Sequence, residues 1–249
     1  MKQIIRQILP EGAMVHLQAV DHYLNGEKEL RLLKHLCDDD RVSLDVGANI
    51  GTYAYFMRRH SRSVICYEPN PKLHHRLSRI YPTLDVRACA VSDCAGTATL
   101  TLPITDGRPE HELASLQQSF DDSEAVEHFD VQTVRLDDED VGDVGFIKID
   151  VERHEFNVLR GAMQLIARCR PKLLTEVTPL LYEQPIPDMF DFITELDYVG
   201  WFRFAGRYRP FSEFRQEVHA AKGQFHGDFM AGNVLFLPRE DGAAFLAMG

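Results

Sequence analysis

A glycine-containing turn between an apolar run and a helix-like stretch is the feature that most constrains the fold of this chain. Residues 42–51 have the sequence VSLDVGANIG, and a second apolar run ends in the sequence YEPNP at 67–71. Gly47 and Gly51 lack the Cβ atoms that would block close approach of a ligand to the backbone. The helix that follows offers free N–H groups at its start. This pattern is typical of a nucleotide-type cofactor site at the edge of a parallel sheet.

An acid at the end of the second apolar run supports this interpretation. Glu68 occupies that position and is followed by Pro69 and Asn70. A carboxylate there can accept hydrogen bonds from both ribose hydroxyls of a nucleotide, as in dinucleotide folds. The alternative is a plain strand–turn–helix unit with an incidental pair of glycines.

The residues of the turn distinguish between cofactors. The dinucleotide fingerprint G-x-G-x-x-G needs a middle glycine to make room for a pyrophosphate. Here Ala48 stands in that place, Asn49 follows it, and Asp45 precedes the turn. A carboxylate at position 45 would repel a pyrophosphate but can receive a cationic or amino-bearing ligand. The sequence therefore favours S-adenosylmethionine, which has a sulfonium and an α-amino group, over NAD.

Blocks of sequence in a fixed order resemble the FkbM-type S-adenosylmethionine-dependent methyltransferases. They are DVGANIGTY at 45–53, YEPNP at 67–71, AVSD at 90–93 and FIKIDVERHE at 146–155. The resemblance runs from residue 27 to residue 238. It differs at Arg153, where the family's usual Val-Glu-Gly-His-Glu has a glycine.

The resemblance implies an acceptor and an adenine site. The acceptor is expected to be a hydroxyl on a small molecule or glycan, such as a sugar or a secondary metabolite. The adenine is expected near Val91, Ser92 and Asp93, where Val91 can pack on the ring and Asp93 can meet the exocyclic amine.

Strand-like and helix-like segments alternate along the chain, which predicts an α/β fold with a doubly wound, mainly parallel sheet. Helices are predicted at 155–168 and 188–196. Strands are predicted at 42–46, 63–67, 86–90, 97–102, 131–135, 146–150, 172–177, 199–204 and 234–237. The resemblance implies the Rossmann-like methyltransferase version of this sheet, with an antiparallel last strand over 233–237.

The chain is predicted to contain a helical cap over residues 1–40 and one catalytic domain over 41–249. Apolar residues at helical spacing between Glu29 and Leu36 indicate the cap. Residues 103–130 combine prolines, a glycine and many acids. A long loop of this kind is usually functional or disordered. We interpret it as a substrate lid, with a solvated acidic loop as the alternative.

Candidate catalytic side chains follow the ends of two predicted strands. Asp150 ends one strand, Glu152 and His154 follow it, and Glu176 ends the next. Lys148 shares the face of Asp150 in an extended strand. Methyl transfer to a hydroxyl needs the acceptor oxygen held close and its proton removed. A histidine is a common base near neutral pH, so His154 is the candidate base, with Asp150 or Glu152 orienting either the histidine or the acceptor.

A metal site is the alternative use of these residues. Asp150, Glu152, His154 and Glu176, together with His226, would suit a hard ion such as Mg²⁺ that lowers the pKa of a hydroxyl. Nothing in the spacing demands a metal, so the sequence does not favour one.

Composition narrows the class of protein further. The net charge is −11 and no basic stripe is present, which disfavours a nucleic-acid partner. The five cysteines show no metal-ligand spacing and suggest a reducing compartment. No apolar stretch is long enough to span a membrane, and the cytoplasm is the expected location.

Other functions remain open. The protein could be an NAD-dependent oxidoreductase or a non-catalytic binding module, or it could methylate a nitrogen instead of an oxygen.

Overall fold

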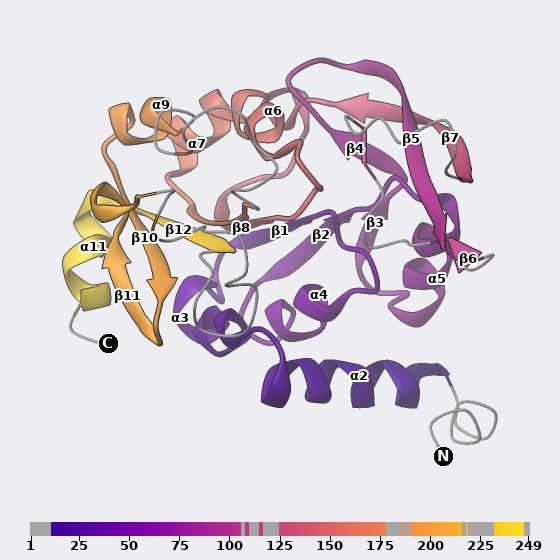
Figure 1. The fold of residues 1–249 in the computed structure, drawn as a ribbon, viewed down its shortest axis with the longest axis horizontal. Helices are drawn as coiled ribbons and strands as arrows, with labels where there is room; N and C mark the ends of the chain where they lie inside the picture. The colour runs from indigo at the N-terminus through magenta and orange to yellow at the C-terminus, as the bar shows by residue number, and fades with distance from the viewer. Residues whose placement is uncertain are drawn as a thin grey trace.

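The structure is an eight-stranded sheet with helices on both faces and a smaller sheet at one side (Figure 1). The strand order is β11-β10-β12-β9-β8-β1-β2-β3. This computed structural model describes residues 11–105, 108–109, 115–116, 125–177, 186, 190–215, 218 and 232–246.

The main sheet has a parallel half and an antiparallel half. The parallel strands are β1 (Val42–Val46), β2 (Ser63–Tyr67), β3 (Asp85–Arg87), β8 (Val144–Ile149) and β9 (Lys172–Glu176). The antiparallel half contains β10 (Tyr198–Phe204), β11 (Arg207–Pro210) and β12 (Asn233–Pro238). β12 lies between β9 and β10 and is antiparallel to both, which confirms the predicted antiparallel last strand.

Helices cover each face of this sheet (Figure 1). One face carries α6 (Glu155–Arg160), α7 (Met163–Cys169) and α9 (Asp191–Glu195). The other carries α3 (Leu33–Leu36), α4 (Thr52–Met57) and α5 (Pro71–Ile80), with α2 (Glu11–Asn25) packed against α4. A 3-10 helix, η1 (Lys28–Leu32), connects α2 to α3, and α11 (Arg239–Leu246) follows β12.

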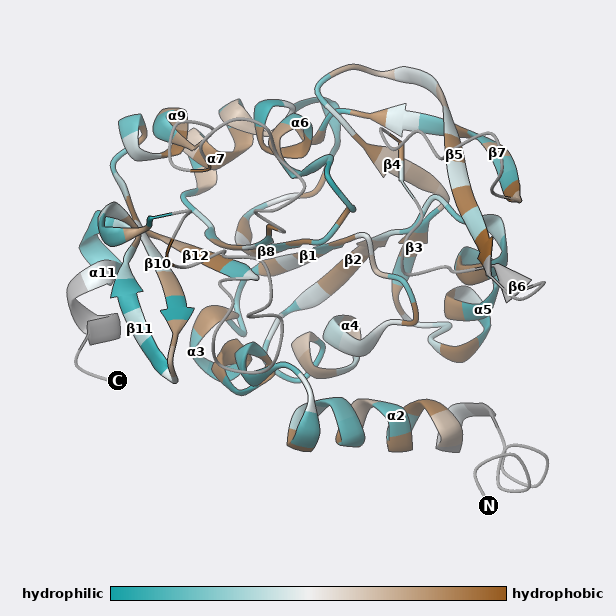
Figure 2. Ribbon diagram, in the orientation of Figure 1, coloured by the Kyte–Doolittle hydropathy of each residue, from teal (hydrophilic) through white to brown (hydrophobic). Residues whose placement is uncertain are grey.

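The core has two layers because alternate strand residues point to opposite faces. Ile147 and Ile149 of β8 pack on one face, whereas Phe146 packs on the other. The central strands are mostly hydrophobic and the edge strand β11 is hydrophilic (Figure 2). Lys148 shares the face of Phe146, so a charged side chain is buried in that layer, beside Asp45 of β1.

The smaller sheet has the order β4-β7-β5-β6. Its strands are β4 (Cys89–Val91), β5 (Gly96–Thr105), β6 (Arg108–Pro109) and β7 (Val126–Val134). The strands β5 and β7 take up both ends of the predicted 103–130 loop. Much of the rest of that segment lies outside the described residues, so its role as a lid stays a prediction.

The structure corrects some predicted boundaries. The strand predicted at 86–90 is divided between β3 and β4, which belong to different sheets. The helix predicted at 155–168 is divided at Gly161, where a Cβ atom would lie 2.0 Å from the carbonyl oxygen of Ser92. The helix predicted at 188–196 is described only from residue 190, with α9 beginning at Asp191. The strand β11 was not predicted, and residues 1–10 of the predicted cap lie outside the described part.

Candidate active site

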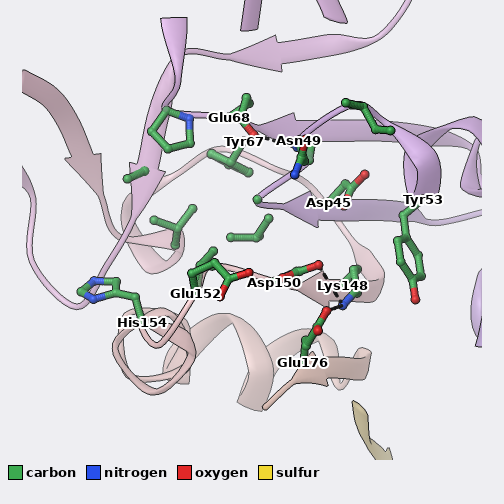
Figure 3. A pocket seen from close by; sticks show the side chains of 18 of the residues that line it. Asp45, Asn49, Tyr53, Tyr67, Glu68, Lys148, Asp150, Glu152, His154 and Glu176 are labelled. Carbon is green, nitrogen blue, oxygen red and sulfur yellow. Dashed lines mark hydrogen bonds and ion pairs between the residues drawn. The ribbon is translucent and has the colours of Figure 1, made fainter. Parts of the chain in front are cut away.

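A cavity of about 290 Å³ opens at the carboxyl ends of β1, β2 and β8 (Figure 3). Ligands of open α/β sheets bind at this edge. The predicted site residues that line it are Asp45, Gly47, Ala48, Asn49, Glu68, Pro69, Val91, Asp150, Glu152, His154 and Glu176. Gly51, Asn70, Ser92 and Asp93, also predicted, are not among the lining residues.

The two glycines of the turn allow close packing against neighbouring parts of the protein. A Cβ atom on Gly47 would lie 1.8 Å from the carbonyl oxygen of Asp150, and one on Gly51 would lie 2.6 Å from Leu77. Both glycines have positive φ values, +81° and +82°, which other residues adopt only with strain. The glycines let the turn pack against the end of β8 and against α5. Close approach of a ligand to Gly47, which lines the cavity, stays a prediction.

Glu68 holds the turn from the end of β2. One carboxylate oxygen accepts the backbone N–H of Asn49 at 2.7 Å, and the other accepts that of Asn70 at 2.8 Å. Burial raises the pKa of Glu68 to about 7, against the effect of these two hydrogen bonds. The carboxyl lies at the cavity wall with lone pairs available beyond these two bonds.

Asp45 lies on β1 and joins that strand to α4. Its carboxylate accepts the backbone N–H of Ala54 at 2.9 Å, which satisfies a free donor in the first turn of the helix. Burial raises the pKa of Asp45 to about 7, although the ammonium of Lys148 acts in the opposite direction. Asp45 and Lys148 are directly paired in register across β1 and β8.

Lys148 is the centre of a charged cluster at the other end of the cavity (Figure 3). Its side chain is 0% exposed, and its ammonium lies 3.6 Å from Asp150 and 3.7 Å from Glu176. The amide oxygen of Asn233 on β12 lies 3.3 Å away, and the ring centroid of Tyr53 lies 4.9 Å away. Burial alone would lower the pKa of Lys148, but Asp150 and Glu176 outweigh it and the pKa is raised. Burial, followed by the charge of Asp150, raises the pKa of Glu176.

The N-terminal segment contributes side chains that the sequence analysis did not identify. His22 and Glu27 line the cavity beside Tyr53. The hydroxyl of Tyr53 donates a hydrogen bond to the carboxylate of Glu27. The sequence pointed to this region only through the predicted helical cap over residues 1–40. That prediction did not identify His22 or Glu27 as cavity residues.

His154 lies apart from the Lys148 cluster. Its Nε2 is 2.9 Å from the Ser92 hydroxyl, and its side chain is buried. Figure 3 shows the imidazole on the opposite side of Glu152 from Asp150. The Nδ1 atom is buried without a hydrogen-bond partner among the described residues. Burial lowers the pKa of His154, with a smaller opposing effect from Asp93. The predicted orientation of His154 by Asp150 or Glu152 is therefore not observed.

A strained turn separates His154 from Asp150. Glu152 and Arg153 have φ values of +49° and +75°, a conformation that costs non-glycine residues about 1–2 kcal/mol each. Arg153 therefore has a left-handed backbone conformation, which the glycine usual in the family would adopt without strain. The hydroxyl of Ser115 donates to the carbonyl of Glu152 at 2.7 Å, and the backbone N–H of Arg153 donates to Glu155.

No group of three His, Cys, Asp or Glu side chains among the described residues is placed to hold a metal ion. The ammonium of Lys148 lies between Asp150 and Glu176, two of the three carboxylates that the alternative metal site would use. His226 lies outside the described part of the chain.

The strand order and the position of the cavity are those of a Rossmann-like, doubly wound α/β domain. Residues 45–199 match the family model described as the methyltransferase FkbM domain, and the chain belongs to this family. The predicted resemblance and fold class are thereby confirmed.

Two known proteins show the extent of the similarity. The hexuronic acid methyltransferase AglP of Haloferax volcanii is 28% identical over 147 residues, 55% of this chain and 57% of that protein. The alignment thus spans little more than half of that relative. The crystal structure of methyltransferase FkbM from Methylobacillus flagellatus KT superposes with a TM-score of 0.52 at 16% identity, covering 95% of this chain and 57% of the other. At that identity the superposition shows the fold alone.

None of the helices in the described residues is long and apolar enough to cross a membrane.

Proposed function

We propose that this protein transfers the methyl group of S-adenosylmethionine to a hydroxyl group of a small molecule or glycan, with a sugar as the favoured acceptor. The observation that carries the proposal is a single cavity that joins the glycine turn and Glu68 to the cluster of Lys148, Asp150 and Glu176. The family supports the reaction class. The sugar acceptor is supported by the name of the relative AglP.

The lining of the cavity fits the chemical groups of S-adenosylmethionine. The Glu68 carboxyl would accept hydrogen bonds from the ribose hydroxyls, and Asp45 would face the positively charged end. Val91, Leu100 and Leu116 form an apolar wall suited to the adenine ring. When bound, the cofactor supplies a methyl group on a positively charged sulfur. We place His154 on the adenine side of the site, because it is hydrogen-bonded to Ser92.

We assign the removal of the hydroxyl proton to Asp150. Its carboxyl lines the cavity and its side chain is 31% exposed, so it is open to an acceptor. The ammonium of Lys148 lies 3.6 Å from the carboxyl of Asp150, whereas burial raises the pKa of Glu176, which therefore retains its proton to higher pH. Proton removal by a positioned carboxylate and alignment of the acceptor each lower the barrier to methyl transfer.

Calorimetric titration with S-adenosylhomocysteine tests the cofactor assignment. We expect binding to the native protein and a loss of at least about tenfold in affinity for Glu68→Gln, because hydrogen bonds to charged groups contribute about 1.5–3 kcal/mol. Glutamine keeps the size of the side chain but can accept only one of the two backbone N–H groups, so the thermal unfolding of Glu68→Gln is measured beside its affinity. Glu195→Gln, at an exposed position on α9 outside the cavity, is the matched control.

A parallel titration with NAD addresses the oxidoreductase alternative. Binding of NAD in place of S-adenosylhomocysteine would overturn the proposal. Equal affinity of Glu68→Gln and the native protein for S-adenosylhomocysteine would contradict the role given to Glu68.

A further inference from the structure

We infer that the acceptor end of the cavity selects a hydroxyl-bearing acceptor that carries no carboxylate, so that neutral sugars are accepted and uronic acids are rejected. This inference rests on the proposed function, because it concerns the acceptor of that reaction. We call the end of the cavity where Lys148 lies the acceptor end. The inference depends on which charged side chains line this end, and on whether one of its positive charges is free to pair with a carboxylate of the acceptor.

Carboxyl groups dominate the acceptor end. Asp150 and Glu176 reach it from the ends of β8 and β9, and Glu27 reaches it from the N-terminal segment. Glu27 is fixed there by the hydroxyl of Tyr53. Lys148 is the only lysine or arginine among the cavity-lining residues that the structure describes.

The charge of Lys148 is already balanced by the Asp150 carboxylate, and the carboxyl group of Glu176 lies close to the ammonium as well. Its ammonium lies between the carboxyl groups of Asp150 and Glu176 at 3.6 and 3.7 Å, and its side chain is 0% exposed. Asn233 and the ring of Tyr53 occupy further sides of the ammonium. A substrate carboxylate would therefore have to displace one of these partners in order to form an ion pair with Lys148.

A carboxylate-bearing acceptor would also be repelled. Like charges a few ångströms apart in a partly buried site cost enough to lower affinity by at least about tenfold. Rejection by unfavourable charge is a general route to specificity. A neutral sugar of the same shape brings hydroxyl groups, which can donate hydrogen bonds to Glu27 and Asp150.

The acceptor end also draws on parts of the chain outside the shared family domain. The family match begins at residue 45, whereas His22 and Glu27 precede it and Asn233 follows its end at residue 199. Segments that flank the matched residues 45–199 therefore form part of this end of the cavity. The name of the relative AglP, a hexuronic acid methyltransferase, consequently does not carry over to the acceptor charge here.

A matched pair of sugars tests the inference. Methyl glucoside and methyl glucuronide share one ring and differ in a hydroxymethyl group against a carboxylate. Binding of each is measured by saturation-transfer NMR on protein saturated with S-adenosylhomocysteine, and methyl transfer is measured by formation of S-adenosylhomocysteine from S-adenosylmethionine. We expect the glucoside to bind at least about tenfold more tightly than the glucuronide.

The outcomes separate this inference from the proposed function. Equal or tighter binding of the glucuronide overturns the inference. Binding of neither sugar by protein that binds S-adenosylhomocysteine also overturns it and leaves the cofactor assignment standing. Failure to bind S-adenosylhomocysteine overturns the proposed function itself.

Glu27→Gln tests the residue assignment. Glutamine keeps an oxygen that can accept from the Tyr53 hydroxyl but removes the negative charge. We expect the preference for glucoside over glucuronide to fall several-fold, while affinity for S-adenosylhomocysteine is unchanged. Glu195→Gln removes the same charge from an exposed site and should leave the preference as in the native protein. An unchanged preference in Glu27→Gln would show that Glu27 does not exclude the carboxylate.

Discussion

Replacing Gly47 with alanine tests why the cofactor turn needs a glycine. The added Cβ atom would lie 1.8 Å from the carbonyl oxygen of Asp150 and 3.2 Å from a methyl group of Val151. The backbone at this position also has a φ of +81°. The structure therefore predicts that alanine forces the turn away from the end of β8 even when no ligand is bound.

The expected loss of stability follows from these two effects. A left-handed conformation costs a non-glycine residue about 1–2 kcal/mol, and forcing extra atoms into a packed site costs about 1–3 kcal/mol. Together they predict a loss of about 3 kcal/mol in the free energy of unfolding. For a domain of this size that corresponds to a fall of roughly 6–12 °C in Tm.

Thermal unfolding followed by circular dichroism without ligand measures this loss. Gly12→Ala is the matched control, because nothing lies within 4 Å of its Cβ position on α2. That change should raise the free energy of unfolding by up to about 1 kcal/mol. If Gly47→Ala unfolds at the native temperature but no longer binds S-adenosylhomocysteine, the glycine serves the ligand and our reasoning is refuted.

Thermal unfolding also measures the remaining predictions. Burial raises the pKa of Glu68 from 4.5 to about 7, so between these pH values the folded state binds a proton at Glu68 that the unfolded state has lost. The free energy of unfolding should therefore fall as the pH rises through this range. Glu68→Gln should show a smaller fall. Arg153→Gly should raise Tm by relieving a φ of +75°, whereas Arg160→Gly, within α6, should lower stability by about 1 kcal/mol. Ser115→Ala should cost about 1–2 kcal/mol, because the Glu152 carbonyl loses its donor.

The main sheet could be predicted because its strands are short apolar runs separated by turns and helices. The prediction of one strand at 86–90 failed because the chain leaves one sheet at Ala88 and joins another without a glycine, a proline or another turn residue to mark the change. Strand partners depend on contacts distant in sequence, so the run itself does not show this change. The division at Gly161 has a similar cause, since the close approach to Ser92 is a tertiary contact.

The cofactor side of the site was more predictable than the acceptor side. The turn and Glu68 are parts of one local strand–turn–helix–strand unit, whose chemistry is visible in adjacent residues. His154 was expected beside Asp150 on the same local grounds, but Glu152 and Arg153 have left-handed backbones that carry it toward Ser92. A single sequence does not show such conformations when the residues are not glycines.

Lys148 explains why the acceptor side could not be predicted from any one segment. It meets Tyr53 of α4, Glu176 of β9 and Asn233 of β12, and Tyr53 in turn holds Glu27. A buried ammonium must have partners, because an unpaired charge in an apolar layer is strongly destabilising. Its partners come from β9 and β12 and from α4, which in turn contacts the N-terminal segment, so segments distant in sequence assemble around the end of β8. The contacts that stabilise Lys148 thereby bring these segments to the place where the acceptor is expected to bind.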